Sequence, residues 1–153
     1  MAQINKSSNY FNTVLYTGNG STQSISGVNF RPDFVWIKER SSTSSHLLED
    51  SVRGATKTLF SNLTDAEGTN TNALTSFDSD GFSTGNSGIT NQSSQTYVAW
   101  NWLASNTTAS NTDGSITSTV SANTTSGFSI VSYTGTGANA TVGHGLGVAP
   151  KMI

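Results

Sequence analysis

Two copies of one pattern organise the chain: Tyr10-Phe-Asn-Thr-Val-Leu-Tyr-Thr-Gly-Asn-Gly20 near the start and Gly127-Phe-Ser-Ile-Val-Ser-Tyr-Thr-Gly-Thr-Gly137 near the end. Each copy has Phe, an alternating apolar run and then Tyr-Thr-Gly-x-Gly, so each predicts a strand that ends in a turn. Tyr16 corresponds to Tyr133, which gives a period of about 117 residues. The second copy breaks off where the first continues. We therefore expect one complete β-rich unit followed by the first strands of a second, truncated repeat, as the N-terminal part of a longer array.

The composition excludes several classes of protein. Ser, Thr and Asn make up about two residues in five, only 10% of residues are charged and the net charge is −2. No basic patch is available to replace the counterions of a nucleic acid, so we expect no nucleic-acid partner. The absence of cysteine excludes a disulfide scaffold. No window is apolar enough for membrane insertion and the start lacks the apolar stretch of a signal peptide. This composition is typical of virion proteins, which are assembled in a host cytoplasm and released by lysis.

Short alternating runs predict an all-β fold. In the strand Phe34–Glu39, Phe34 and Trp36 share one face while Val35 and Ile37 share the other. The strongest predicted strand is 95–102, and we expect it to pair with Phe34–Glu39. Turn residues between these runs leave about eight to ten short strands per unit at hairpin spacing, which favours an antiparallel β-sandwich, most simply a jelly roll.

The same patterns predict a domain plan. Residues 1–9 form a polar arm, 10–103 the sandwich unit, 104–114 a linker without apolar pattern, and 115–153 the opening strands of the second repeat. We expect the run Ile116–Val120 to be an edge strand. A short capping-box pattern at Thr64–Glu67 allows one helical turn.

Few residues suggest chemistry, and each has a structural alternative. Asp78 and Asp80 resemble the start of a calcium loop, but the later ligands are missing, so a turn with side-chain hydrogen bonds is favoured. Asp50 with Arg53 predicts an ion pair between strands, with ligand binding as the alternative. Paired carboxylates for glycoside hydrolysis are also conceivable, at Asp33 with Glu39 or Glu49 with Asp50, but the second pair points to opposite faces of a strand. We expect no catalytic residues, metal or cofactor.

The three tryptophans allow either core packing or sugar stacking. We expect Trp36 and Trp100 in the core. Trp102 ends its strand, and we take it as a candidate ligand-binding residue beside Asp50 and Arg53.

Several motifs together resemble a repeat in structural proteins of marine tailed phages, cyanophages among them. The resemblance covers essentially the whole chain and is carried by Phe-x-x-Val-x-Tyr-Thr-Gly-x-Gly, His144-Gly-Leu-Gly-Val-Ala-Pro150, Asp50-Ser-Val-Arg-Gly-Ala55, Ser79-Asp-Gly-Phe82 and Tyr97-Val-Ala-Trp-Asn-Trp102. It implies a tail-fibre or virion protein with a concanavalin A-like sandwich. Such a fold does not by itself establish sugar binding.

We therefore expect a non-enzymatic phage structural protein, a tail fibre or other appendage. Its N-terminal unit would anchor it to other tail or capsid proteins, with Gln3, Asn5 and Tyr10 as contact residues, and later repeats would face the host. A homo-oligomer is expected. The alternative is a carbohydrate-binding module that adheres to host surface glycan, and a glycan depolymerase is the least supported reading.

Overall fold

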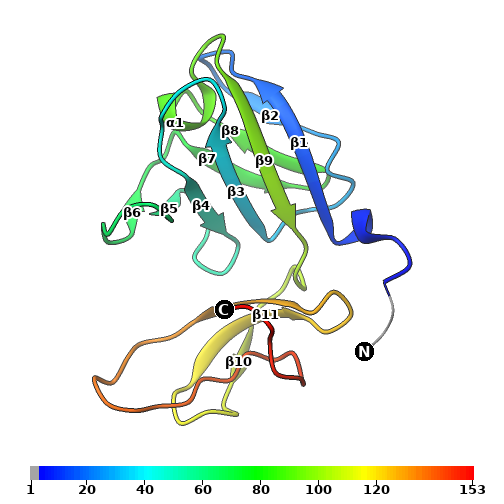
Figure 1. Cartoon of the computed structure of the whole chain (residues 1–153), viewed down its shortest axis with the longest axis vertical. Helices are drawn as coiled ribbons and strands as arrows, with labels where there is room; N and C mark the ends of the chain where they lie inside the picture. Colours follow the sequence, from blue (N-terminus) through cyan, green and yellow to red (C-terminus); the bar gives the residue numbers. More distant parts are fainter. Residues whose placement is uncertain (1–3) are drawn as a thin grey trace.

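The protein is built almost entirely from antiparallel β-strands. The computed structural model describes residues 4–153, and Figure 1 shows its course. In chain order the elements are a 3-10 turn η1 (Ser7–Asn9), β1 (Phe11–Thr17), β2 (Gln23–Ile25), β3 (Phe34–Glu39), β4 (Leu47–Asp50), β5 (Lys57–Phe60), β6 (Gly68–Thr69), β7 (Leu74–Asp78), β8 (Gly81–Thr84), α1 (Gly88–Asn91), β9 (Thr96–Trp102), β10 (Ala109–Asn111), β11 (Ser118–Asn123) and β12 (Phe128–Ser132).

The largest sheet has six strands in the order β1-β9-β3-β4-β5-β6. The longest register is that of β9, which pairs with β1 from Phe11↔Trp102 to Thr17↔Thr96 and with β3 from Phe34↔Trp102 to Glu39↔Tyr97. The predicted pairing of Phe34–Glu39 with 95–102 is therefore confirmed. Strand β9 lies between β1 and β3 and pairs with both. The six-stranded sheet is therefore complete only when the chain has been made up to residue 102.

A second sheet, β2-β8-β7, packs behind the first and completes the sandwich (Figure 1). The core between the two sheets consists of Ile25, Val35, Ile37, Leu47, Ala73, Leu74, Phe82, Tyr97 and Ala99, all of them buried. The all-β sandwich is thus as predicted. Strand β2 does not pair with β1, which precedes it in the chain; it crosses to the opposite sheet and pairs with β8.

The third sheet, β10-β11-β12, lies at the end of the sandwich where β9 finishes (Figure 1). In this C-terminal part of the chain Ile116, Val120 and Leu146 are buried. Strand β10 lies inside the segment that the sequence predicted to be a linker. The expected edge strand at Ile116–Val120 was wrong, since β11 is the central strand of this sheet with a neighbour on each side.

Helical structure is confined to short turns. The turn expected at Thr64–Glu67 is extended or irregular, and the four-residue helix α1 occurs instead at Gly88–Asn91. No helix in the described range 4–153 is long and apolar enough to cross a bilayer.

The Tyr-Thr-Gly-x-Gly motif of the first copy holds the α1 turn in place. Tyr16 stacks on Tyr97 at a centroid distance of 5.0 Å and donates a hydrogen bond to the Thr90 carbonyl at 2.7 Å. Burial raises the pKa of Tyr16 far above its ordinary value, so it remains a donor. A Cβ atom at Gly18 would lie 2.2 Å from the Gln92 carbonyl oxygen, which explains why this position needs glycine.

This close approach gives a test with a matched control inside the chain. Gly18→Ala forces the backbone around Gln92 to move, and we expect a loss of about 1–3 kcal/mol in the free energy of unfolding. Gly135→Ala, at the corresponding position of the second copy, meets no heavy atom within 4 Å, and we expect little change. Denaturant unfolding of both variants measures the difference. Equal losses would show that the close approach at Gly18 does not matter.

Candidate functional site

The outer face of the six-stranded sheet carries an aromatic strip. Because side chains alternate along a strand, the residues next to the core positions point outward. They are Phe11, Leu15, Phe34, Trp36, Trp100 and Trp102, with His46 just before β4. The expectation that Trp36 and Trp100 lie in the core was wrong. Both are partly buried on the face opposite to the core, because they alternate with the inward-pointing Val35, Ile37 and Ala99.

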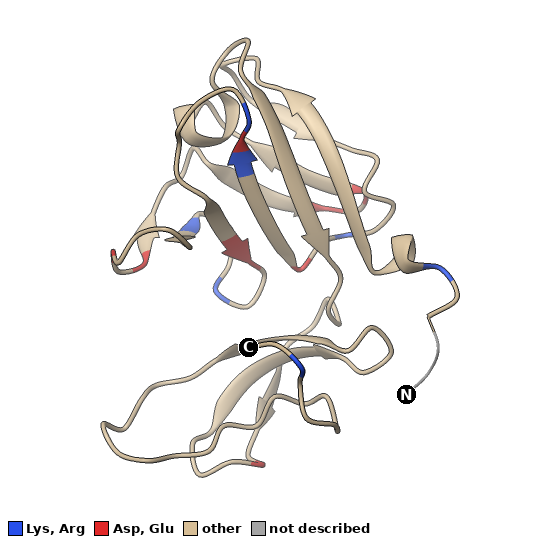
Figure 2. Cartoon of the chain, in the orientation of Figure 1, with Lys and Arg blue, Asp and Glu red and all other residues tan. Residues whose placement is uncertain are grey.

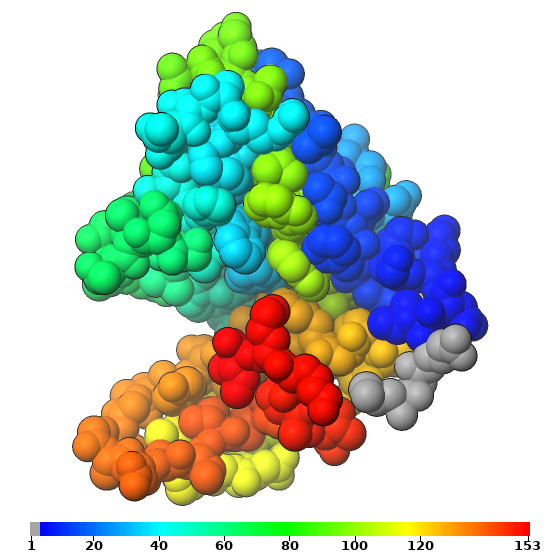
Figure 3. Space-filling model, viewed as in Figure 1, coloured from blue at the N-terminus to red at the C-terminus, as the bar shows by residue number. Residues whose placement is uncertain are grey.

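The open half of this strip is built around Trp36. Its ring meets Trp100 edge to face at a centroid distance of 5.6 Å, and its Nε1–H donates a hydrogen bond to Nδ1 of His46 at 2.9 Å. Leu15 lies on β1, which neighbours β9, and is 63% exposed. Figure 3 views this face and shows β9 at the surface between β1 and the β3–β4 region. The result is a mainly apolar platform in which the Trp36 indole N–H is paired with His46.

The other half of the strip is covered by the third sheet. Phe128 stacks on Trp102 at 6.1 Å and also lies 6.2 Å from Phe34, while Phe11 packs on Trp102 at 4.8 Å. A groove of about 230 Å³ runs beside this cluster, and Tyr10 lines it together with Trp102. Trp102, predicted as a ligand residue, is therefore mainly part of the junction between the first unit and the third sheet.

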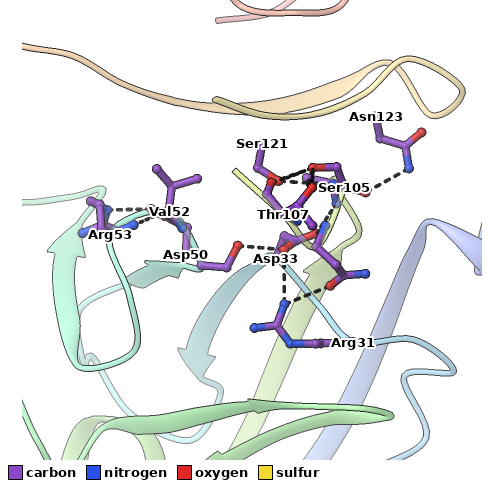
Figure 4. Close-up of polar contacts among 12 residues, drawn as sticks. Arg31, Asp33, Asp50, Val52, Arg53, Ser105, Thr107, Ser121 and Asn123 are labelled. Carbon is purple, nitrogen blue, oxygen red and sulfur yellow. Dashed lines mark hydrogen bonds and ion pairs between the residues drawn. The ribbon is translucent and has the colours of Figure 1, made fainter. Parts of the chain in front are cut away.

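A buried carboxylate fastens the same junction. Asp33 is 0% exposed, and its Oδ2 accepts hydrogen bonds from the backbone N–H groups of Ala104 at 2.8 Å and Asn106 at 2.9 Å (Figure 4). Its Oδ1 accepts the Ser51 hydroxyl at 2.7 Å, and Arg31 lies 3.6 Å away. The segment after β9, at the start of the expected linker, is thus bound to Asp33 through two of its backbone N–H groups.

Asp50 and Arg53 meet as predicted. Arg53 Nε lies 2.5 Å from Asp50 Oδ2, and the guanidinium also donates to the carbonyls of Leu48 and Lys57. Figure 4 shows Asp50 and Arg53 facing each other across the turn. They line a shallow groove of about 300 Å³ whose other wall is β12 with Tyr133. Trp102 lies in the other groove, so the three predicted ligand residues do not converge on one site.

Glu49 is a fully buried carboxyl group on β4. Its Oε2 accepts the Thr56 N–H at 3.1 Å while Oε1 has no hydrogen-bond partner among the described residues. Burial raises its pKa to about 7, and the Thr56 hydrogen bond only partly opposes this. Glu49 is not open to a substrate. Asp33 and Glu39, the other predicted carboxylate pair, are separated by the whole length of β3, or roughly 20 Å of extended chain.

The remaining predicted residues lie apart from these features. Asp78 accepts the hydroxyls of Ser76 and Ser83, and Asp80 accepts two backbone N–H groups in the β2–β3 connection. Within residues 4–153 no three His, Cys, Asp or Glu side chains gather as metal ligands. Asn5 is exposed, and Gln3 lies outside the described residues. Charged side chains are scattered over the first unit, and the third sheet carries few (Figure 2).

Comparison with protein-family models gave a match to the chain. The profile of a domain of unknown function, DUF7483, matches residues 6–153, which covers both the sandwich and the third sheet. The chain belongs to this family. Comparisons with curated proteins and with solved structures gave no significant match. The structure therefore provides the geometry of a DUF7483 domain, whose description assigns no activity.

Sequence reasoning missed the residues that matter most at the junction. Asp33 was considered only as half of a catalytic pair, and Phe128 only as part of the repeat. A signal was available for Asp33, because it follows Pro32 and opens a strand that pairs with the end of β9. Nothing local in the sequence indicates that Ala104 and Asn106 turn back toward it.

The raised pKa of Glu49 predicts a specific pH dependence. The protonated form is favoured in the folded state, so this contribution to stability is complete below about pH 4.5 and is lost as the pH rises through about 7. The loss is about 3 kcal/mol at most, from about 1.4 kcal/mol per pKa unit. Glu49→Gln removes the titration, so the difference in unfolding free energy between wild type and variant should change between pH 4.5 and 8. A pH-independent difference would contradict the assignment.

Removal of the Asp33 carboxylate tests whether its hydrogen bonds stabilise the junction. Asp33→Ala leaves the N–H groups of Ala104 and Asn106 without an acceptor, which we expect to cost about 2–4 kcal/mol. Hydrogen exchange at these two amides should accelerate more than exchange in the core strand β9. Ser51→Ala removes only the hydroxyl donor and serves as the control. Unchanged protection of the two amides in the Asp33 variant would refute the role of the carboxylate.

Proposed function

We propose that this protein is a non-enzymatic structural component of a phage particle, a tail fibre or another appendage. The observation that carries the proposal is the junction at Asp33 and Phe128, which clamps consecutive β-units to each other. Figure 3 shows the third sheet in contact with the end of the first unit. A fibre has to transmit force and orientation along its length, and a clamped junction does so better than a flexible linker.

Composition and sequence resemblance support the same proposal. The surface is rich in Ser, Thr and Asn and poor in charge, as in proteins that function outside cells, and the motifs resemble repeats of tailed-phage structural proteins. In this proposal the N-terminal segment with Asn5 and Tyr10 contacts other tail or capsid proteins. The protein is a homo-oligomer of the virion, and units after the first are directed to the host.

The direct test is the protein content of purified particles. Mass spectrometry of gradient-purified phage carrying this gene should detect the polypeptide at a constant ratio to the major tail or capsid proteins, and antibody labelling should place it on an appendage. Detection only in the lysate, with none in particles, would overturn the proposal.

One observation favours glycan binding as a second candidate function. The platform of Trp36, Trp100 and Leu15 presents an apolar surface of the kind on which sugar rings stack. Beside it, the exposed Thr13 of β1 lies opposite Trp100, and Lys38 of β3 donates to the carbonyls of Glu39 and Ser42. With so few polar groups beside the rings, we expect weak and broad sugar recognition.

Substitution of the platform distinguishes the two candidate functions. If the platform binds host glycan, Trp100→Ala should lower adsorption of the chain to host envelope polysaccharide by about tenfold or more. Leu63→Ala, at an exposed apolar side chain in the β5–β6 loop, is the control. Equal adsorption of both variants would remove glycan binding by this face and leave the structural role untouched.

A further inference from the structure

Strand β1 forms one edge of the six-stranded sheet, and within residues 4–153 it pairs with β9 alone (Figure 1). Edge strands of soluble proteins are usually protected from pairing with other chains by charged side chains, proline or a bulge. Strand β1 reads Phe-Asn-Thr-Val-Leu-Tyr-Thr, without charge or proline, and its register with β9 is unbroken. This edge therefore lacks the usual protection.

The register with β9 shows which backbone groups of β1 point to the free edge. Just before β1 the Leu103 N–H donates to the Tyr10 carbonyl, and just after it the Gly18 N–H donates to the Gln95 carbonyl. Hydrogen-bonded pairs alternate along an antiparallel ladder, so the even-numbered residues of this stretch bond to β9. The N–H and C=O groups of the odd-numbered residues therefore face away from the sheet.

Side chains of the same chain already cap two of these edge groups. The Asn12 side-chain oxygen accepts the Thr13 N–H at 3.0 Å, and the Gln23 amide donates to the Thr17 carbonyl at 3.3 Å. Four edge groups of 13–17 have no partner in the described chain: the Thr13 C=O, the N–H and C=O of Leu15, and the Thr17 N–H. Two donors and two acceptors thus remain, arranged symmetrically about Leu15.

This arrangement is complementary to itself. If a second copy of the strand runs antiparallel with Leu15 opposite Leu15, the two leucines exchange two backbone hydrogen bonds, and each Thr13 C=O receives the partner's Thr17 N–H. The capped groups then face each other, so no free group meets a capped one. A two-fold pairing centred on any other residue of 13–17 sets at least one free group against a capped one.

We propose that β1 is the contact between two copies of this chain, paired antiparallel about a two-fold axis at Leu15. The two six-stranded sheets continue as one, and the exposed side chains of Leu15, Thr13 and Thr17 meet their partners on its outer face. Neither β1 nor its neighbour β9 contains a charged residue, so no like charges meet at the axis.

The inference names the contact for the homo-oligomer of the proposed function, but it rests only on the geometry of β1. A chain that stays monomeric would overturn it. Whether the protein belongs to a phage particle would still be decided by the protein content of purified particles.

The sequence contains no cysteine, so single-cysteine variants test both the partner and the register. Opposed residues of a hydrogen-bonded pair have Cα atoms about 5.5 Å apart, within the range of a disulfide. In a glutathione redox buffer we expect Leu15→Cys to form a covalent dimer in at least about tenfold higher yield than Thr13→Cys. Thr13→Cys is the matched control on the same strand and face, since the two copies of residue 13 lie roughly 13 Å apart along the strands. An equimolar mixture of Thr13→Cys and Thr17→Cys should cross-link, because these residues are opposed.

Reversible association is measured by sedimentation velocity over a concentration series. The wild-type chain should show a monomer–dimer equilibrium. Leu15→Lys sets two ammonium groups opposite each other and should raise the Kd for dimerisation at least about tenfold. Leu63→Lys adds the same charge at an exposed leucine in the β5–β6 loop, at the other end of the sheet, and should dimerise like wild type.

Three results would overturn the inference. They are equal cross-linking of Leu15→Cys and Thr13→Cys, a wild-type chain that remains monomeric up to its solubility limit, and a Leu15→Lys chain that dimerises as tightly as wild type. Because Leu15 is 63% exposed, its variants should keep the fold, and their unfolding curves verify this before the association assays.

Discussion

The arrangement of the two parts depends on the burial of one carboxylate. Asp33 is inaccessible to solvent, and a buried charge is tolerated only when its oxygens are fully hydrogen-bonded. The available donors are the Ser51 hydroxyl and the backbone of residues 104–106, so that segment has to turn toward β3. Once it has turned, β10 and β11 begin at a defined place and Phe128 reaches Trp102. The hydrogen bonds that the buried Asp33 carboxylate needs therefore determine the junction, and the packing of Phe128 on Trp102 stabilises it further.

The two faces of the six-stranded sheet differ in how far they are covered. The inner face is a conventional apolar core, whereas the outer face carries an aromatic strip that is only partly covered. Phe128 covers the end near Trp102 and leaves Trp36 and Trp100 at the surface of the described chain. Exposed aromatic area of this kind is a common feature of binding and assembly surfaces. Of the two candidate functions, glycan binding uses this strip, as a platform on which sugar rings would stack.

Local pattern was sufficient to predict the strands, and it failed where distant segments meet. Alternation in Phe34–Glu39 and in 95–102 predicted both strands, their faces and their mutual pairing. It could not show which face is inward, because Trp36 and Trp100 are as apolar as Val35 and Ile37. The linker expected at 104–114 rested on the lack of an apolar period in Ser, Thr and Asn. Such a pattern gives no sign of the hydrogen bonds that the Ser105 N–H and the Asn123 side chain make across the junction. Of the candidate site, the Asp50–Arg53 pair was predictable from its spacing, and the covering of Trp102 by Phe128 was not.

The central claim is that the first unit and the third sheet move as one rigid body. Amide residual dipolar couplings of the chain in a weakly aligning medium test this most directly, since they report the orientation of both parts in one frame. The structure predicts that couplings from β1–β9 and from β10–β12 fit a single alignment tensor. Two tensors of different magnitude, as expected of units joined by a flexible linker, would contradict the clamped junction and the structural role built on it.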